Sequence, residues 1–460
     1  MLETIAHFLP VLMFGSMVLL IFTGYPVAFV LGAIGVSFGL IGIVLDEFHM
    51  IQFRNVVPRI YRQTVENPVF VAIPLFVFMG SIMQRSRIAE DLLIAMQAVI
   101  GNSRGGLAIA VVAVGTVLAA MTGLIGASVA MIGLIALPLM IEKNYRPSFA
   151  SGVVASAGTL GILIPPSIML IIMGDILQIP VSALFAGAIV PGILLATAYI
   201  VFIFVASRLN PALAPRVEPA PGAPKGLAGI LKLLRHLLPP LTLIALVLGS
   251  IYGGWATPTE AAAVGCTGAL ILAAMRGALS LGNFNGMMRD AALTVAMVYF
   301  VIFGATVFSY VFRVLGGDEL AVEVLNALGL ETGTGYLIAL MVGVFILGFF
   351  FDWLEIILIM FPIFGPILMS ADFSGVVEGR MDVMVWIAVL VAVNMQTSFL
   401  TPPFGFALFY LKGVAPRSVT MPTIYRGVIA FVLIQLFVLG LTYMWPELVL
   451  HLPRSWGLMF

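Results

Sequence analysis

The chain of 460 residues is 62% hydrophobic and only 9% charged, whereas about a quarter of the residues in soluble proteins are charged. This composition excludes a water-soluble protein and predicts a polytopic membrane protein. Basic and acidic residues balance at 21 each, so no positive excess indicates a nucleic-acid partner. The single cysteine, Cys266, excludes an intrachain disulfide, and the four histidines are too scattered to predict a metal site.

Apolar runs follow one another along the whole chain, and a transmembrane helix needs about 20 such residues. The charge-free run 11–45 predicts two helices with a turn near Gly24 to Pro26. Later runs lie at 68–84, 105–141, 147–207, 237–275, 291–312, 332–351, 353–371, 383–411 and 427–446. Together they predict about 11 or 12 transmembrane helices plus re-entrant pieces, because several runs are too long for one crossing and too short for two. The N-terminus lacks the positive start of a secretory signal, which predicts no cleaved peptide.

One segment, 208–236, does not fit a membrane. It contains five prolines and five basic residues against the single acid Glu218. We predict a solvated linker followed by an interfacial helix, on the cytoplasmic side by the positive-inside rule. The segment divides the chain into a first half, 1–207, and a second half, 237–460.

The two halves share a pattern that indicates an internal repeat. In each half a polar residue precedes an apolar stretch that ends in proline ten positions later, from Ser128 to Pro138 and from Asp352 to Pro362. A second pair of similar segments follows in the same order, at 158–167 and 396–405.

Each of these later segments contains a Pro-Pro pair inside an apolar run. Proline removes a backbone donor and disfavours helical backbone before it, so a helix is predicted to break before Pro165 and again before Pro402. Each pair suits the first turn of the helix that resumes. Unwound carbonyls and nearby hydroxyls suit a hard cation such as Na⁺, and the resumed helix offers its positive end to a carboxylate. Paired interruptions in matching positions indicate a transporter site at the membrane midplane. The alternative is that each Pro-Pro pair only kinks a packed helix.

Three acids in apolar surroundings have two interpretations each. Thr257 to Glu260 has the form of a helix capping box, with a substrate or proton role as the alternative. Asp352 and Glu355 share a helix face at i, i+3, and intramembrane acids are candidates for function. Asp352 also stands at a predicted helix start, where an acid is favourable for structural reasons alone.

Three segments resemble one known family: Gly158-Thr-Leu-Gly-Ile-Leu-Ile-Pro-Pro-Ser167, Ala256-Thr-Pro-Thr-Glu-Ala-Ala-Ala263 and Asn394-Met-Gln-Thr-Ser-Phe-Leu-Thr-Pro-Pro-Phe-Gly405. They are similar to the large membrane subunit of TRAP transporters, the tripartite ATP-independent periplasmic carriers for organic acids. The resemblance extends over about residues 5–445. It implies an all-α polytopic membrane protein of about 11 to 12 helices, in two inverted repeats with two re-entrant hairpins and two broken helices, of the elevator type.

The resemblance also implies where the sites lie. The hairpins are expected near 105–141 and 334–370, with tips at 126–130 and near 351–353, and the broken helices at 148–175 and 383–412. The expected Na⁺ ligands, one site per half, are Gly126, Ser128, Gly158, Thr159, Gly161, Asp352, Thr397, Ser398 and Thr401. The expected substrate-binding residues are Ser128, Pro165, Pro166, Ser167, Asn394, Pro402 and Pro403.

By the same resemblance, the expected function is uptake of an organic acid across the bacterial inner membrane, driven by Na⁺ as the coupling ion, without an organic cofactor. The implied partners are a small four-helix membrane subunit, a periplasmic substrate-binding protein and the lipid bilayer. A single-component Na⁺- or H⁺-coupled symporter is the alternative within this class. An intramembrane enzyme would need a catalytic pair at membrane depth, which the acids do not form, and a channel would be expected to show a pore-lining repeat.

Overall fold

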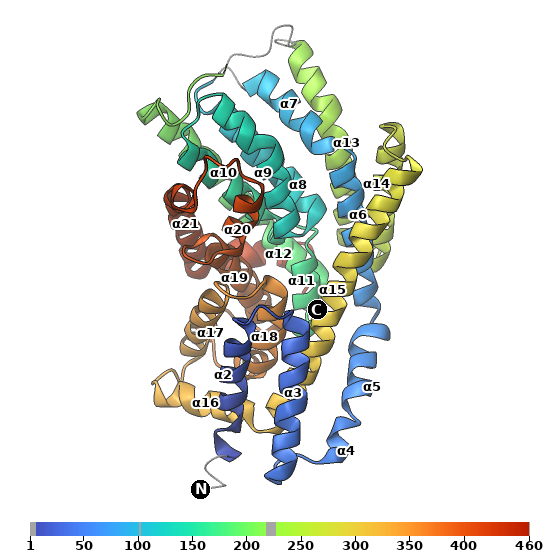
Figure 1. The fold of residues 1–460 in the computed structure, drawn as a ribbon, viewed down its shortest axis with the longest axis vertical. Helices are drawn as coiled ribbons and strands as arrows, with labels where there is room; N and C mark the ends of the chain where they lie inside the picture. Colours follow the sequence, from blue (N-terminus) through green and yellow to red (C-terminus); the bar gives the residue numbers. More distant parts are fainter. Residues whose placement is uncertain (1–5, 101–102, 218–226, 460) are drawn as a thin grey trace.

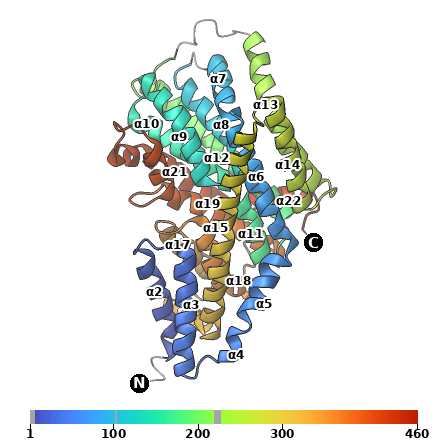
Figure 2. The same cartoon turned by 45° about the vertical axis from the view of Figure 1, so that its right-hand side comes forward.

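The computed structural model describes residues 6–100, 103–217 and 227–459. Within these residues the secondary structure is helical, without a β-strand, and ten helices are long and apolar enough to cross a membrane. The all-α polytopic fold predicted from composition is therefore confirmed. Figures 1 and 2 show an elongated assembly in which the N-terminus lies at one end and α7 and the start of α13 at the other.

The helices of the first half follow the predicted runs. They are α2 (Leu9–Ile21), α3 (Val27–Val44), α4 (Met50–Phe53), α5 (Val56–Ile60), the π-helical turn η1 (Tyr61–Val65), η2 (Pro68–Val71), α6 (Ala72–Arg85), α7 (Ile88–Ile100), α8 (Gly106–Thr122), α9 (Ile125–Glu142), α10 (Pro147–Thr159), η3 (Leu160–Ile162), α11 (Ile168–Ile176) and α12 (Val181–Leu209).

The second half continues with α13 (Leu227–Tyr252), α14 (Pro258–Met275), α15 (Leu281–Val314), α16 (Gly317–Ala327), α17 (Gly333–Leu347), α18 (Trp353–Ser370), α19 (Arg380–Leu400), α20 (Phe406–Val414), α21 (Met421–Met444) and α22 (Glu447–Ser455). Thr257 caps α14 and Glu260 bonds back to the Thr257 N–H at 2.8 Å, so the predicted capping box is confirmed.

The helices form two groups that pack against each other. In the first, α15 packs on both α3 and α6, and α6 packs on α14, with α5 along α15. In the second, α10 and α19 lie at the centre, among α8, α9, α12, α20 and α21. Every residue of α19 from Val383 to Leu400 is buried, as is every residue of α10 from Phe149 to Thr159. The segments that carry the Pro-Pro motifs are therefore the core of the second group.

Two helical hairpins approach this core from opposite ends. The α8–α9 hairpin lies in the upper part of Figure 1 and the α17–α18 hairpin in the lower part, so the two are inverted. The second tip falls at 348–352, next to the predicted position. The first tip was predicted at 126–130 and this was wrong: the turn is at Gly123 and Leu124. Gly123 ends α8 in the left-handed conformation (φ +61°), which glycine adopts without steric cost, and residues 126–130 already belong to α9.

Both core helices are interrupted where the prolines predict. The first interruption covers 163–167, and the second covers 401–405, between α19 and α20. The prediction that each pair occupies the first turn of the next helix was wrong, since α11 starts two residues after Pro166 and α20 three residues after Pro403. Ser167 and Gly405 take the N-cap positions instead, so the unwound backbone is longer than the sequence pattern indicates.

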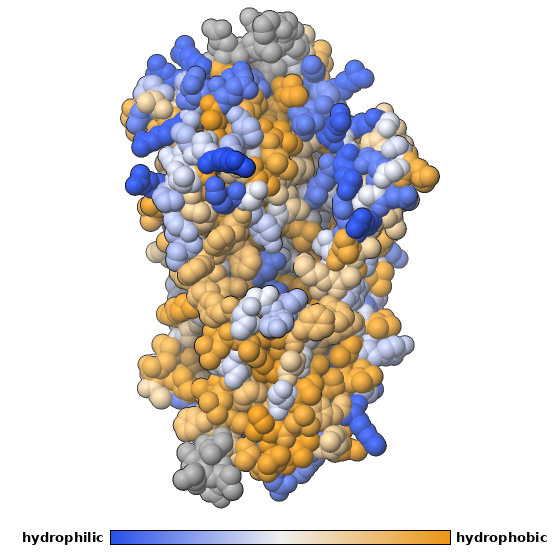
Figure 3. Space-filling view, in the orientation of Figure 1, coloured by the Kyte–Doolittle hydropathy of each residue, from blue (hydrophilic) through white to orange (hydrophobic). Residues whose placement is uncertain are grey.

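The predicted division at 208–236 needs a correction. Helix α12 extends to Leu209, residues 218–226 lie outside the described part, and α13 runs without a break from Leu227 to Tyr252 through Pro239 and Pro240. The predicted interfacial helix is thus the first part of the continuous helix α13, which is a candidate membrane span. Hydrophilic residues gather toward the upper end of the face in Figure 3, the end at which α13 begins in Figure 1, while hydrophobic residues dominate the lower part.

Candidate functional site

The first candidate site lies where the α8–α9 tip meets the interruption after α10. Thr122 Oγ1, at the end of α8, is 2.5 Å from Ser128 Oγ in the first turn of α9. Ser128 Oγ in turn is 3.3 Å from the position that a methyl group on Gly161 would take. Thr159 donates its hydroxyl hydrogen to Ser156 O at 3.0 Å. Ser128 and Gly161 are therefore brought together as predicted, and Thr122 joins them although sequence reasoning did not single it out.

Two glycines of the predicted first site serve close packing. A methyl group on Gly158 would lie 2.4 Å from Val129 Cγ2 and 2.7 Å from Val129 Cα, so α9 and α10 are in backbone contact there. Gly126 faces the other half of the chain, because a methyl group on it would lie 2.8 Å from Tyr410 Cζ in α20. Gly126 therefore packs against α20 and Gly158 against α9, and in both places the close approach is possible because glycine has no side chain.

The second candidate site repeats this arrangement with different side chains. The Ser398 hydroxyl lies against Gly348 at the end of α17, where a methyl group would be 2.0 Å from Ser398 Oγ. Thr397 donates to Val393 O at 3.1 Å and Thr401 to Thr397 O at 2.7 Å. These bonds use the hydroxyl hydrogens and leave oxygen lone pairs free.

Asp352 begins the second arm of the hairpin. It caps α18 by accepting from the Trp353 N–H at 2.9 Å, which confirms the predicted helix start at this acid. Among the described residues no hydrogen bond joins Asp352 to the hydroxyls of Thr397, Ser398 or Thr401. The predicted link between the acid and these hydroxyls is therefore not a direct hydrogen bond.

The expected substrate residues differ in accessibility. Pro165, Pro166 and Ser167 are buried, and Ser167 donates to Ile162 O at 2.6 Å. Pro403 is exposed and Pro402 half-buried. Both Pro-Pro segments contain a cis peptide bond. They differ in solvent exposure, because the first is buried and the second is partly exposed.

Asn394 lies further from the interruption than the other expected residues. Its side chain donates to Met341 O in α17 at 2.7 Å and ties the hairpin to α19.

Two further polar side chains are buried near the second site without a protein partner. Glu355 Oε2 and both amide atoms of Gln396 form no hydrogen bond within the described residues. Buried polar atoms are nearly always satisfied, so these oxygens fit a role in binding a cation or a polar ligand. Gln396 had a sequence signal, since it opens the second repeated segment, but its amide was not assigned a role.

The donor set of both sites consists of oxygen atoms. Hydroxyl, carboxylate, amide and backbone carbonyl oxygens are the ligands that hard cations select. The residues present therefore fit Na⁺, and no group of three or more His, Cys, Asp or Glu side chains gathers in the part of the chain that the structure describes.

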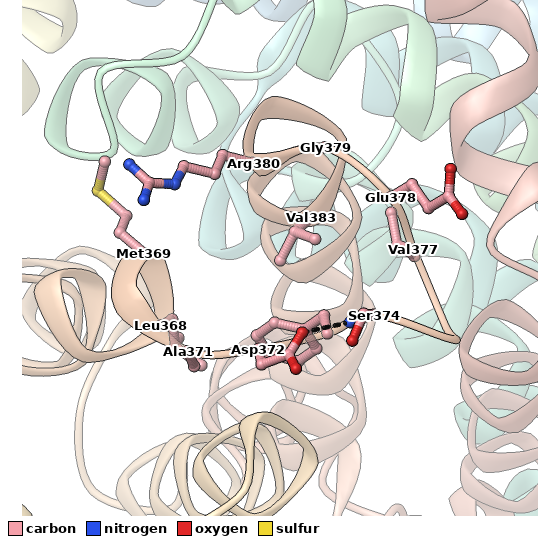
Figure 4. A pocket seen from close by; sticks show the side chains of 11 residues that line it. Leu368, Met369, Ala371, Asp372, Ser374, Val377, Glu378, Gly379, Arg380 and Val383 are labelled. Carbon is pink, nitrogen blue, oxygen red and sulfur yellow. Dashed lines mark hydrogen bonds between the residues drawn. The ribbon is translucent and has the colours of Figure 1, made fainter.

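Further cavities lie outside the Pro-Pro motifs. A cavity of about 370 Å³ lies at the loop 371–379 between α18 and α19. There Asp372 accepts from the Ser374 N–H at 2.8 Å. The side chains of Glu378 and Arg380 point away from each other in Figure 4 and do not converge on one ligand position. The second cavity, of about 400 Å³, separates the two helix groups and is lined by three arginines.

The described part of the chain contains ten candidate spans and two inverted hairpins, each of which faces an interrupted helix. This arrangement defines a polytopic membrane transporter. Residues 14–448 match the family model of the tripartite ATP-independent periplasmic transporter DctM component, and the chain belongs to this family.

The relatives agree with this family, and one solved structure shares the fold. The chain is 32% identical to the C4-dicarboxylate TRAP transporter large permease protein DctM of Pseudomonas aeruginosa, over 86% of this chain and 88% of that protein. It is 25% identical to the sialic acid TRAP transporter large permease protein SiaM of Vibrio cholerae, over 95% and 96%. The crystal structure of the Alcanivorax borkumensis YdaH transporter shares the fold, with a TM-score of 0.59 and 13% identity over 90% of this chain and 91% of that one.

Proposed function

We propose that this permease takes up an organic acid across the bacterial inner membrane, driven by a Na⁺ gradient. The observation that carries the proposal is the pair of oxygen-lined interruptions, each facing a hairpin tip. Each of them offers hydroxyls whose hydrogens are already bonded to backbone carbonyls. One Na⁺ would be held by Ser128, Thr159 and the backbone around Gly161, and another by Ser398, Thr401 and the acids of α18.

The substrate class follows from the printed names of the relatives and from the free helix ends. Relatives are named for C4-dicarboxylates, sialic acid and ectoine or 5-hydroxyectoine. The N-termini of α11 and α20 direct unpaired N–H groups toward the interruptions, where a carboxylate is favourable. A carboxylate bound between the two Pro-Pro segments would contact both halves of the repeat.

The mechanism we propose is of the elevator type, in which the group centred on α10 and α19 moves past the group of α3, α6, α14 and α15. Its support is the buried, polar core of the group centred on α10 and α19 and the extensive contact between α3 and α15 in the other group. The basic start of α13 orients that end toward the cytoplasm. A small four-helix membrane subunit and a periplasmic substrate-binding protein are the proposed partners.

Cation binding can be tested without knowing the substrate. The protein is purified with its small subunit, and unfolding is compared in NaCl, KCl and choline chloride at one ionic strength. A ligand at 100 times its Kd stabilises the folded state by about 2.7 kcal/mol. Stabilisation specific to Na⁺ is expected, reduced in Thr159→Ala and Ser398→Ala. Thr116→Ala, which removes a hydroxyl bonded to Val112 O in α8, is the matched control and is expected to keep the response. Equal unfolding in all three salts refutes the Na⁺ assignment.

Uptake into proteoliposomes tests the rest of the proposal. Transport of a carboxylate is expected only with an inward Na⁺ gradient and the binding protein present. Uptake without the binding protein would favour the single-component symporter. Absence of counterflow exchange would favour a channel, because only a carrier exchanges bound substrate.

A further inference from the structure

The cavity of about 400 Å³ lies between the two helix groups. One wall comes from α5, η1 and α15, and the other from the end of α11 and from α18. Figure 2 shows α11 and α18 beside α15, with α5 at the edge. Because α11 packs on α12 and α19, and α18 packs on α17 and α19, the second wall adjoins the group centred on α10 and α19. A bound molecule would therefore contact both groups.

Three arginines give this cavity a positive lining. Arg59 and Arg62 stand at i, i+3 on α5 and η1, and Arg313 lies near the end of α15. Asp175 is the one acid among the lining residues, and its carboxylate accepts from Asn67 Nδ2 at 2.5 Å. In a chain whose charges balance overall, this lining therefore has an excess of positive charge.

The three arginines differ in how many partners their guanidinium groups already have. Arg313 is 3.2 Å from Asp318 and donates to Pro362 O at 3.2 Å, which leaves further N–H groups of its guanidinium. Arg59 stacks over the Tyr310 ring at 4.6 Å. Neither Arg59 nor Arg62 forms an ion pair within the described residues. Two guanidinium groups are thus available to an anion from outside.

We propose that Arg59, Arg62 and Arg313 form an anion-binding vestibule that receives the carboxylates of the substrate before it reaches the interrupted helices. The inference rests on the proposed function and adds the residues that attract the substrate. Guanidinium groups bind carboxylates in a planar, two-pronged geometry. A cavity of this volume falls within the ordinary range for small-molecule sites.

The position of the cavity fits a path to the transport site. Along α15 the lining extends from Ile302 to Arg313, which spans about 16 Å at 1.5 Å per residue. Its inner end lies at Asp175, in the last turn of the same α11 that begins next to Ser167. Gln63, which accepts from Thr306 Oγ1 at 3.3 Å, adds polar groups suited to substrate hydroxyls.

The vestibule can be tested with thiol reagents of opposite charge. In a Cys266→Ala background, Gln63→Cys places one thiol on the cavity wall, and Ser309→Cys is the second variant in case the first fails to fold. The reference is Thr23→Cys, in an exposed turn whose flanking residues in the sequence are uncharged. Labelling rates are measured with an anionic and a cationic methanethiosulfonate in nanodiscs.

We expect the anionic-to-cationic rate ratio in the cavity to exceed the reference ratio about tenfold or more. The combined change Arg59→Gln and Arg62→Gln should return it close to the reference. Arg54→Gln, on the same segment but not on the cavity wall, should leave it unchanged. A cavity ratio equal to the reference refutes the positive vestibule.

Protection identifies the chemistry of the anion. Succinate is expected to slow labelling more than inorganic phosphate or chloride at the same ionic strength. Protection by phosphate alone would overturn the carboxylate assignment and point to a lipid headgroup or free phosphate. Labelling requires neither Na⁺ nor transport, so a failed vestibule and a failed Na⁺ assignment give separate results.

Discussion

Gly158→Ala tests whether the contact between the first hairpin and the first broken helix is as close as the structure indicates. The added methyl group would meet Val129 at its Cγ2 (2.4 Å), its Cα (2.7 Å) and its backbone N (2.9 Å). A side chain can rotate away, but the Val129 backbone can move only if α9 and α10 separate. Overpacking of this kind typically costs about 1–3 kcal/mol.

The change also bears on the proposed cation site, since Gly158 precedes Thr159 and Val129 follows Ser128. Separating α9 from α10 would draw the Ser128 and Thr159 oxygens apart. We therefore expect Gly158→Ala to lower the free energy of unfolding and also to reduce the stabilisation specific to Na⁺. The assay is unfolding of the purified complex in mixed detergent micelles, in NaCl and in choline chloride.

The matched control is Gly413→Ala, within α20 of the same helix group, where no atom lies within 4 Å of the added methyl group. Alanine in a helix interior is favoured over glycine by about 0.5–1 kcal/mol, so this variant should be neutral or slightly more stable. If Gly158→Ala unfolds like Gly413→Ala and keeps its full Na⁺ response, the backbone contact and the reasoning built on it are refuted.

Three further predictions concern single interactions. Thr257→Ala removes the cap of α14 and should cost about 1 kcal/mol of stability in the same unfolding assay. The control Thr267→Ala, on the exposed side of that helix, should cost little. Equal losses of stability in the two variants would contradict the capping role. Trp386→Phe should destabilise the protein by about 1–3 kcal/mol, because Trp386 Nε1 donates to Thr442 O at 3.0 Å and Pro446, four residues after Thr442, has no N–H to replace this donor. The control is Trp445→Phe, at an exposed position. A loss of stability no larger than in that control would argue against the bond. Asp372 lies in the loop outside the spans, and hydrogen bonds from the Ser374 side chain and backbone lower its pKa below the ordinary 3.8. Its ionised form therefore stabilises the loop at pH values above 3.8, and this contribution is lost as the pH falls through the lowered pKa. The difference in melting temperature between the wild type and Asp372→Asn should therefore shrink on acidification, and a difference that grows would show that the sign is wrong.

Local features were predictable because they are encoded by neighbouring residues. Proline removes its own backbone donor, so the breaks near Pro165 and Pro402 follow from the sequence alone. The capping box at Thr257 and the cap at Asp352 are equally local, since each bond joins residues no more than three positions apart. Membrane spans follow from the length of the apolar runs.

Helix limits inside long apolar segments were less predictable. The family resemblance placed the first tip a few residues too late, and the sequence has a glycine both at 123, where the chain turns, and at 126. Only the backbone shows that Gly123 takes a left-handed conformation while Gly126 is helical and faces Tyr410, 284 positions later in the numbering. The start of α13 was missed because Lys232 and Arg235 were taken to mark a separate interfacial helix.

By itself, therefore, the sequence determined the class of fold, the two interruptions and the residue types beside them. Tertiary structure decided which groups meet: Ser128 with Thr122 and Gly161, Ser398 with Gly348, and three arginines from two distant segments around one cavity. The physical reason is that helix breaks and caps depend on bonds within a few residues. Contacts between helices depend instead on how side chains from both halves fill a common core, and local sequence patterns do not predict which of these residues contact each other.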